Sequence, residues 1–180
     1  MIVRPARAAD VADIAALLAP AIARGEVLPR AVRADEFLVA EAADGALVGA
    51  VALSPWNDEV VELGALVSSL PGAGVGSALA RAAAIAADAR GYDLIVALTH
   101  IPEWFAGRGF APVSDPPWAR VRGIPSMPDT RFPELGTAVG AKARKSCAGC
   151  AHVASCGQAL VALRTARSAA APALPQKVCA

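Results

Sequence analysis

The chain has 180 residues, of which 56% are hydrophobic, and its 17 lysines and arginines nearly balance its 16 aspartates and glutamates. A net charge of +1 gives no reason to expect the broad basic surface that binds nucleic acids or anionic membranes, and no apolar run approaches the roughly 20 residues of a transmembrane helix. We therefore expect a single domain with no nucleic-acid or membrane partner, acting on a small molecule.

The sequence shows no secretory signal, because Met1 is not followed by a basic segment, an apolar core and a cleavage site. We therefore expect the protein in the cytoplasm, where its four cysteines would be thiols or metal ligands rather than disulfides. The sequence leaves the oligomeric state open, with a homodimer as one alternative.

The N-terminal part predicts a strand over residues 2–5 and a helix over residues 8–24. The helix is indicated by apolar residues that recur every three or four positions, namely Val11, Ile14, Leu18 and Ile22. Pro20 is expected to kink or end this helix. Residues 25–33 are expected to form a loop or a broken second helix.

A β-hairpin is predicted next. Residues 36–42 and 47–53 are rich in strand-forming residues, and Asp44-Gly45 between them is a strong turn signal. A further strand is expected over residues 60–67.

Three glycines, Gly72, Gly74 and Gly76, then open a long alanine-rich helix that Gly91 should end. Its expected sheet-facing residues are Val75, Leu79, Ala82 and Ala86. Such a loop suits a phosphate, because glycines let a ligand approach and a helix N-terminus offers free N–H groups. The spacing disfavours a dinucleotide-binding fold, and the lack of a lysine after Gly76 disfavours a P-loop. A glycine turn without a ligand remains an alternative.

The second half predicts a buried strand from Tyr92, a short helix near Ile101, and another strand opened by Arg108-Gly109-Phe110. Residues 114–140 hold five prolines and little periodicity, which favours an extended surface segment. Residues 159–167 predict a final short helix before a poorly ordered tail.

At Gly74-Val75-Gly76 and Gly109-Phe110 the chain resembles the GNAT acetyltransferases. In that family the fourth strand leads into a [QR]-x-x-G-x-[GA] loop for coenzyme A, and a G-F turn starts the sixth strand. The chain is most similar to the acetyltransferase domain of N-acetylglutamate synthases. The matching segments are Val27-Leu28-Pro29-Arg30, Ala52-Leu53-Ser54-Pro55, Glu62-Leu63, Leu98-Thr99 and Trp104-Phe105. The resemblance covers about residues 1–113, with a weaker match at Arg144-Lys145-Ser146.

The resemblance implies that acetyl-CoA binds along the fourth strand and the glycine loop. In the family the fourth and fifth strands splay apart, the pantetheine arm follows the free edge, and a backbone N–H there polarises the thioester. By position that edge is residues 65–67. The implied coenzyme-binding residues are Leu66, Val67, Gly72, Gly74, Val75, Gly76 and Ser77.

The resemblance also implies that Glu62 is the general base, with Glu59 as the fallback. Thr99 is a candidate for protonating the departing thiolate, since Tyr92, the only tyrosine, lies elsewhere. A solvated glutamate at a strand start is the alternative for Glu62.

Arg30 and Arg144 are the implied substrate-binding residues, because a guanidinium binds a carboxylate through two hydrogen bonds and keeps its charge. Two such arginines would hold a dicarboxylic amino acid. Each could instead be a surface charge.

The chain departs from the family in two places. Pro71 replaces the usual loop Gln or Arg and lacks an N–H, and the stretch from Glu62 to Gly76 is a couple of residues short, which leaves open how tightly the loop binds a pyrophosphate. His100 stands where relatives have an arginine, which leaves glutamate specificity open.

Cys147, Cys150, His152 and Cys156 form a compact C-x-x-C-x-H-x-x-x-C pattern. Such a set has enough sulfur and nitrogen for tetrahedral zinc, and reduced thiols are the alternative. No residue is assigned as a metal ligand, and Cys179 lies in the tail.

The sequence thus predicts the α/β GNAT fold, a mixed and mostly antiparallel twisted sheet with helices on both faces. Residues 1–157 are expected to form the domain, with a core at 1–113 and an extension at 114–157, followed by a short helix and tail at 158–180. The expected activity is acetyl transfer from acetyl-CoA to the α-amine of a small amino acid, glutamate first. The alternatives are a non-catalytic acyl-CoA-binding regulatory module and a GNAT acting on another small amine.

Overall fold

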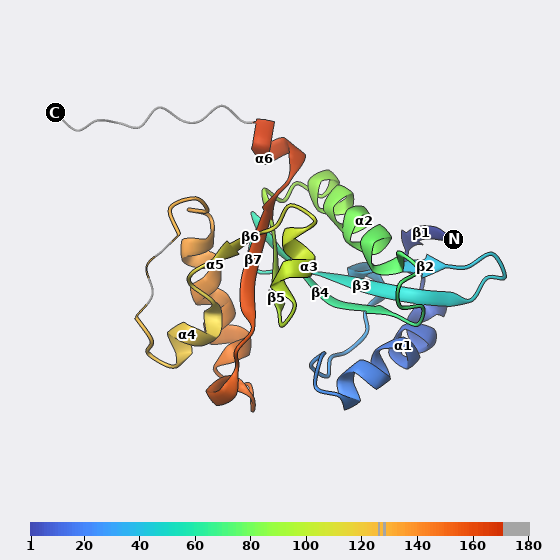
Figure 1. Cartoon of the computed structure of the whole chain (residues 1–180), viewed down its shortest axis with the longest axis horizontal. Coiled ribbons are helices and arrows are strands. Elements are labelled where there is room, and N and C mark those ends of the chain that lie inside the picture. Colours follow the sequence, from blue (N-terminus) through green and yellow to red (C-terminus); the bar gives the residue numbers. More distant parts are fainter. Residues whose placement is uncertain (126, 128, 171–180) are drawn as a thin grey trace.

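The computed structural model describes residues 1–125, 127 and 129–170. A seven-stranded sheet in the order β1-β2-β3-β4-β5-β7-β6 runs through them (Figure 1). The strands are β1 Ile2–Pro5, β2 Phe37–Glu41, β3 Leu47–Pro55, β4 Val60–Ser68, β5 Leu94–Thr99, β6 Ala111–Val113 and β7 Ala159–Arg164. Neighbouring strands are antiparallel except β4 and β5, which are parallel. The sheet is therefore mixed and mostly antiparallel, as predicted.

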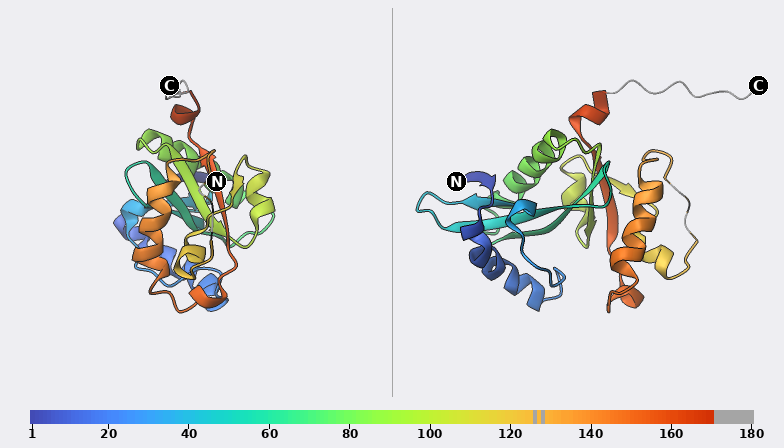
Figure 2. Two further views of the ribbon diagram at one scale, coloured as in Figure 1. Left: turned by 90° about the vertical axis from the view of Figure 1, so that its left-hand side faces the viewer. Right: turned by 180° about the vertical axis from the view of Figure 1, so that it is seen from behind.

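Helices cover both faces of the sheet. They are α1 Val11–Ala23, α2 Val75–Ala89, α3 Pro102–Ala106, α4 Pro117–Val121, α5 Leu135–Lys142 and α6 Ala166–Ala170. The two views in Figures 1 and 2 place α1 and α2 on opposite sides of β2, β3 and β4. The apolar clusters agree: α2 and α3 pack on one face, while α1 and α5 pack on the other. Within the described part of the chain, no helix is long and apolar enough to cross a membrane.

The helix α1 buries Ile14, Leu18 and Ala21 against the sheet. Pro20 lies inside this helix on its exposed side and does not end it, since the helix continues for three more residues to Ala23. The helix follows a single 3₁₀ turn, at which the carboxylate of Asp10 accepts hydrogen bonds from the Arg7 N–H and from Arg4. The Arg4 bond is the main cause that lowers the pKa of Asp10 to about 2.

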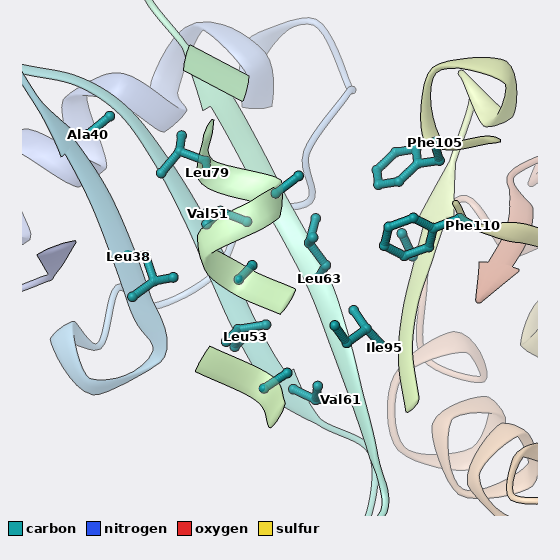
Figure 3. Close-up of a cluster of buried hydrophobic side chains, with 14 of the residues drawn as sticks. Leu38, Ala40, Val51, Leu53, Val61, Leu63, Leu79, Ile95, Phe105 and Phe110 are labelled. Carbon is teal, nitrogen blue, oxygen red and sulfur yellow. The ribbon is translucent and has the colours of Figure 1, made fainter. Parts of the chain in front are cut away.

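The core beneath α2 is drawn in Figure 3, where Leu79 faces Val51 and Leu63 of the central strands. The buried side chains of α2 are Val75, Leu79, Ala80, Ala83 and Ala87. The predicted sheet-facing residues Ala82 and Ala86 are half-buried at the margin of this cluster. The buried face is therefore turned slightly from the predicted one, and its alanines let the helix lie close to the sheet.

Residues 159–167 are not the predicted helix. Residues 159–164 form β7, which pairs with β5 along all six residues from Leu94 to Thr99 and carries β6 on its other edge. The helix prediction is wrong because the run Leu160-Val161-Ala162 is buried on both faces of the sheet, and so short an apolar run does not distinguish a strand from a helix. The sheet therefore includes residues beyond 157.

The prediction of an extended segment over residues 114–140 is also wrong in part. It contains α4 and most of α5, and α5 buries Leu135, Ala138 and Val139 against the sheet. Prolines 116 and 117 stand at the start of α4, a position where proline is compatible with a helix. Cys179 and most of the tail that the sequence predicts lie in residues 171–180, outside the described residues.

Candidate active site

The strands β4 and β5 separate at Glu62. They pair through Val60, Val61 and Glu62, after which β5 continues in register only with β7 among the described residues. The remainder of β4, residues 63–68, pairs with β3 alone. One edge of β4 therefore offers unpaired backbone N–H and C=O groups, which an extended ligand can engage.

A β-bulge interrupts this free part of β4. Gly64 lies opposite Ala52 and Val67 lies opposite Ala50, so two residues of β4 face a single residue of β3. Ala65, one of the two, has φ 48°, a left-handed conformation that costs an alanine energy and often marks a functional site. A bulge leaves backbone groups outside the ladder and redirects them. The predicted coenzyme-binding residue Leu66 is the second residue of the bulge, and Val67 follows it directly.

The glycine loop joins the open end of β4 to α2. Gly72 and Gly74 have φ 79° and 78°, and no other group lies within 4 Å of the place where a Cβ would stand. The first backbone bond of the helix runs from Ala78 N–H to the Gly74 carbonyl, at 3.0 Å. The N–H groups of Val75, Gly76 and Ser77 come before Ala78 in the chain, so no helix carbonyl lies one turn back to accept their hydrogen bonds. Together they form the anion-binding end that the sequence predicts.

Trp104 and Arg108 stand beside the first turn of α2, a feature that sequence reasoning missed. The Arg108 guanidinium stacks 3.5 Å from the Trp104 ring centre and donates hydrogen bonds to the Trp104 carbonyl and the Ser77 hydroxyl. Gly76 allows this approach, because a Cβ there would lie 3.5 Å from the indole. The only sequence signal for this role of Arg108 is that a basic residue stands directly before Gly109-Phe110.

A cavity of about 470 Å³ opens on the outer side of this arrangement, between α2 and the segment after α3. It is lined in part by Ser77, Arg81 and Arg108. The Nε of Arg108 is buried and, among the described residues, has no hydrogen-bond partner. This end of α2 therefore combines free amides with two arginines, which suits a ligand that carries phosphates.

Glu62 lies on the face covered by α1 and α5, at the point where β4 and β5 separate. Its Oε2 accepts hydrogen bonds from Trp56 Nε1 at 2.7 Å and from Lys142 Nζ at 2.6 Å. The side chain is 16% exposed and that of Lys142 20%. The Oε1 atom lies over Gly64, 3.5 Å from the place a Cβ would take there. Glu62 is therefore not a solvated surface residue.

Arg30 lies on the same face as Glu62. Its Nη1 donates to the Ser54 hydroxyl at 3.0 Å, and Ser54 lies directly opposite Glu62 on β3, so the two side chains are neighbours on one side of the sheet. Arg30 also pairs with Glu36. Arg30 and the candidate base are therefore linked through Ser54 on one face of the sheet.

Arg144 is not brought to this face. It is exposed in a π-helical turn, Ala143–Cys147, and lines a cavity of about 340 Å³ with Arg120 and Gly140. Lys142, two positions earlier, is the residue that reaches Glu62, and residues two positions apart point to sides of a helix about 200° apart. The expectation that Arg144 binds substrate beside Glu62 is therefore corrected: the cation that this segment brings to Glu62 is Lys142.

Among the described residues, the other polar candidates make no hydrogen bond to Glu62, although the Cys147 thiol lies near enough for the charges of Glu62 and Lys142 to act on it. Thr99 is buried at the end of β5, where its hydroxyl accepts the Ile101 N–H, and His100 is exposed. Cys147, Cys150 and Cys156 are free thiols, and burial raises the pKa of the Cys147 thiol. Within residues 1–125, 127 and 129–170, no three His, Cys, Asp or Glu side chains are grouped as a metal ion would require.

Neither a protein-family model nor a curated protein matches the sequence. Solved structures do match the fold. N-acetylglutamate synthase from Neisseria gonorrhoeae, complexed with coenzyme A and N-acetyl-glutamate, is 25% identical with a TM-score of 0.64. The match covers 91% of this chain and 35% of that protein. The chain therefore spans about a third of the length of that synthase.

Two further structures match at lower identity. A Mycobacterium tuberculosis protein in complex with coenzyme A and a ligand named NLQ is 22% identical, with a TM-score of 0.66, and the match covers 91% of this chain and 99% of that one. A phosphinothricin acetyltransferase of the GNAT superfamily from Sinorhizobium meliloti, in complex with acetyl-CoA, is 21% identical with a TM-score of 0.53. That match covers 62% of this chain and 75% of that one.

Proposed function

We propose that this chain, which has the fold of the GNAT acetyltransferases, moves an acetyl group from acetyl-CoA to the α-amine of a small amino acid. Glutamate is the first candidate acceptor. The observation that carries the proposal is the free, bulged edge of β4 beside Glu62, since it offers backbone donors and a carboxylate at one place. The coenzyme-bound neighbours support the choice of acetyl-CoA.

Each part of the site has a role in this reaction. The amides of Val75, Gly76 and Ser77 would hold the pyrophosphate, and the edge at Leu66 and Val67 would pair with the pantetheine arm. A backbone N–H of the bulge would donate to the thioester oxygen as it becomes negative.

Glu62 would accept a proton from the ammonium group of the acceptor, which leaves a neutral amine. The amine nitrogen then forms a bond to the carbonyl carbon and the carbon–sulfur bond breaks. The departing coenzyme A thiolate takes up the second proton that this nitrogen loses, so that an amide and a free thiol are formed. The carboxylate is close to Gly64 and the bulge, so the proton acceptor and a backbone donor for the oxyanion would both lie beside the reacting carbon.

Arg30 is the proposed ligand for an acceptor carboxylate. Arg30→Ala should lower kcat/KM for glutamate by about 10- to 100-fold, because a hydrogen bond to a charged group contributes about 1.5–3 kcal/mol. The loss should depend on the carboxylate that Arg30 binds, so an acceptor without that group should show little change. Steady-state kinetics with glutamate, glutamine and an amino-acid amide would measure this.

The matched control is Glu36→Gln, which removes the ion pair of Arg30 while keeping the guanidinium. It should leave kcat/KM for glutamate nearly unchanged. If both variants lose activity equally, or if Arg30→Ala affects all acceptors alike, Arg30 supports the fold and does not select the acceptor.

The test of the proposed function is a thiol-release assay with acetyl-CoA and a panel of amino acids, because transfer liberates coenzyme A whichever amine accepts. We expect release with glutamate or a close relative. Release with another amine alone would keep the acetyltransferase and reject glutamate. Coenzyme binding without release for any amine would instead favour a non-catalytic acyl-CoA-binding module.

A further inference from the structure

Lys142 joins the candidate base from a part of the chain 80 residues away. Its Nζ lies 2.6 Å from Glu62 Oε2, and both side chains are largely buried. We propose that Lys142 is a positioning residue for acetyl transfer, which holds Glu62 so that one carboxylate oxygen faces the acceptor. The inference rests on the proposed function and adds to it a role for the extension after residue 113.

The two hydrogen-bond donors converge on a single oxygen. Trp56 Nε1 and Lys142 Nζ both donate hydrogen bonds to Oε2, and neither donates one to Oε1. Oε1 lies over Gly64, next to the bulge at Ala65. The carboxylate is thus fixed at one oxygen, and the other is directed along β4 to the place where the thioester would be held.

The positions of both donors are set by one apolar cluster. Trp56 is 6% exposed and packs with Leu135 and Val139 of α5 against β4 and β5. Lys142 is the last residue of α5, and its ammonium lies 5.6 Å from the Trp56 ring centre. The packing of α5 therefore fixes the indole N–H and the ammonium relative to each other, as a preorganised site requires.

A different role for Lys142 would be to bind a carboxylate of the acceptor directly. The two roles predict different kinetics. A residue that positions the base changes kcat, because the misplaced carboxylate acts in the transition state, whereas a residue that binds the acceptor mainly changes KM. Because Lys142 already contacts Glu62, the structure favours the first role.

The test is a steady-state comparison of four variants: Lys142→Met, Lys142→Arg, Glu62→Gln, and the double variant of Lys142→Met with Glu62→Gln. Lys142→Met should lower kcat about 10- to 100-fold, the cost of a displacement of about 1 Å at a reacting group. KM for the acceptor should stay within about twofold. Lys142→Arg, which keeps a cation, should recover most of kcat.

The double variant gives the most direct readout. If Lys142 acts through Glu62, Lys142→Met should have no further effect once Glu62 is glutamine. The control is Lys145→Met, since Lys145 is an exposed lysine of the adjoining turn, and it should keep wild-type kinetics. Thermal unfolding of each variant shows whether it is folded. If Lys142→Met is unfolded, Lys142→Gln takes its place in the comparison.

Three results would overturn the inference. Unchanged kcat in a folded Lys142→Met variant would show that Trp56 alone is sufficient to position Glu62. A raised KM with normal kcat would make Lys142 an acceptor ligand. An equal loss in the wild-type and Glu62→Gln backgrounds would make its role structural. In all three cases the wild type remains an active acetyltransferase, whereas a wild type that releases no thiol would reject the proposed function itself.

Discussion

Replacing Glu62 with glutamine is expected to lower kcat of acetyl transfer by about 10²- to 10⁴-fold, the range for loss of a general base. Glutamine keeps the size of the side chain and an oxygen that can accept the Trp56 and Lys142 hydrogen bonds, but it cannot take a proton. Because Glu62 lies on the face opposite α2, acetyl-CoA affinity should remain near that of the wild type. Turnover by thiol release and binding by calorimetry would measure the two quantities.

Glu59 offers the comparison within the same stretch of chain. It is exposed in the turn before β4, and Glu59→Gln should leave kcat within about twofold, the scatter expected of an exposed polar change. Wild-type turnover in Glu62→Gln, or a large loss in Glu59→Gln instead, would contradict the assignment of the base.

Gly74→Val is expected to weaken acetyl-CoA binding by about 10- to 100-fold. Gly74 is the residue before α2 and has φ 78°, a conformation that valine adopts only at a cost of about 1–2 kcal/mol. The loop would shift, and the amides of Val75 and Gly76 would move away from the pyrophosphate. The loss of one hydrogen bond to a charged group, about 1.5–3 kcal/mol, accounts for the expected change in affinity.

Gly45→Val separates backbone strain from ligand binding. Gly45 lies in the hairpin between β2 and β3 with φ 88°, and like Gly74 it has open space around the position of a Cβ. Both variants should therefore lose similar stability, but only Gly74→Val should lose coenzyme affinity. If calorimetry gives the same acetyl-CoA affinity for both variants, the glycine loop is not the coenzyme site.

Local signals in the sequence were sufficient for much of the fold. The Asp44-Gly45 pair identified the hairpin, the apolar spacing of Ile14 and Leu18 identified α1, and Gly91 marked the end of α2. The separation of β4 and β5, and the assignment of the glycine loop to coenzyme A, came from the family resemblance. These features are set by residues close together in the chain or by family motifs, and both kinds of signal can be recognised in a single sequence.

Features that depend on distant neighbours were missed. The run from Ala159 is a strand because β5 and β6 have free edges for it, and nothing local distinguishes it from a helix. Lys142 was overlooked for the same reason, since only the packing of α5 directs it to Glu62. Arg144 was chosen by a short motif, and the turn of the helix directs it elsewhere.

The central claim is tested most directly by following the acetyl group itself. The protein would be incubated with acetyl-CoA carrying a labelled acetyl group and with a mixture of amino acids, and the products identified by mass spectrometry. We expect the labelled acetyl group on the α-nitrogen of glutamate or of a closely related amino acid, in amounts equal to the coenzyme A released, and formed about 10²- to 10⁴-fold more slowly by Glu62→Gln. Coenzyme A released with labelled acetate alone, or no label in any amine, would contradict it.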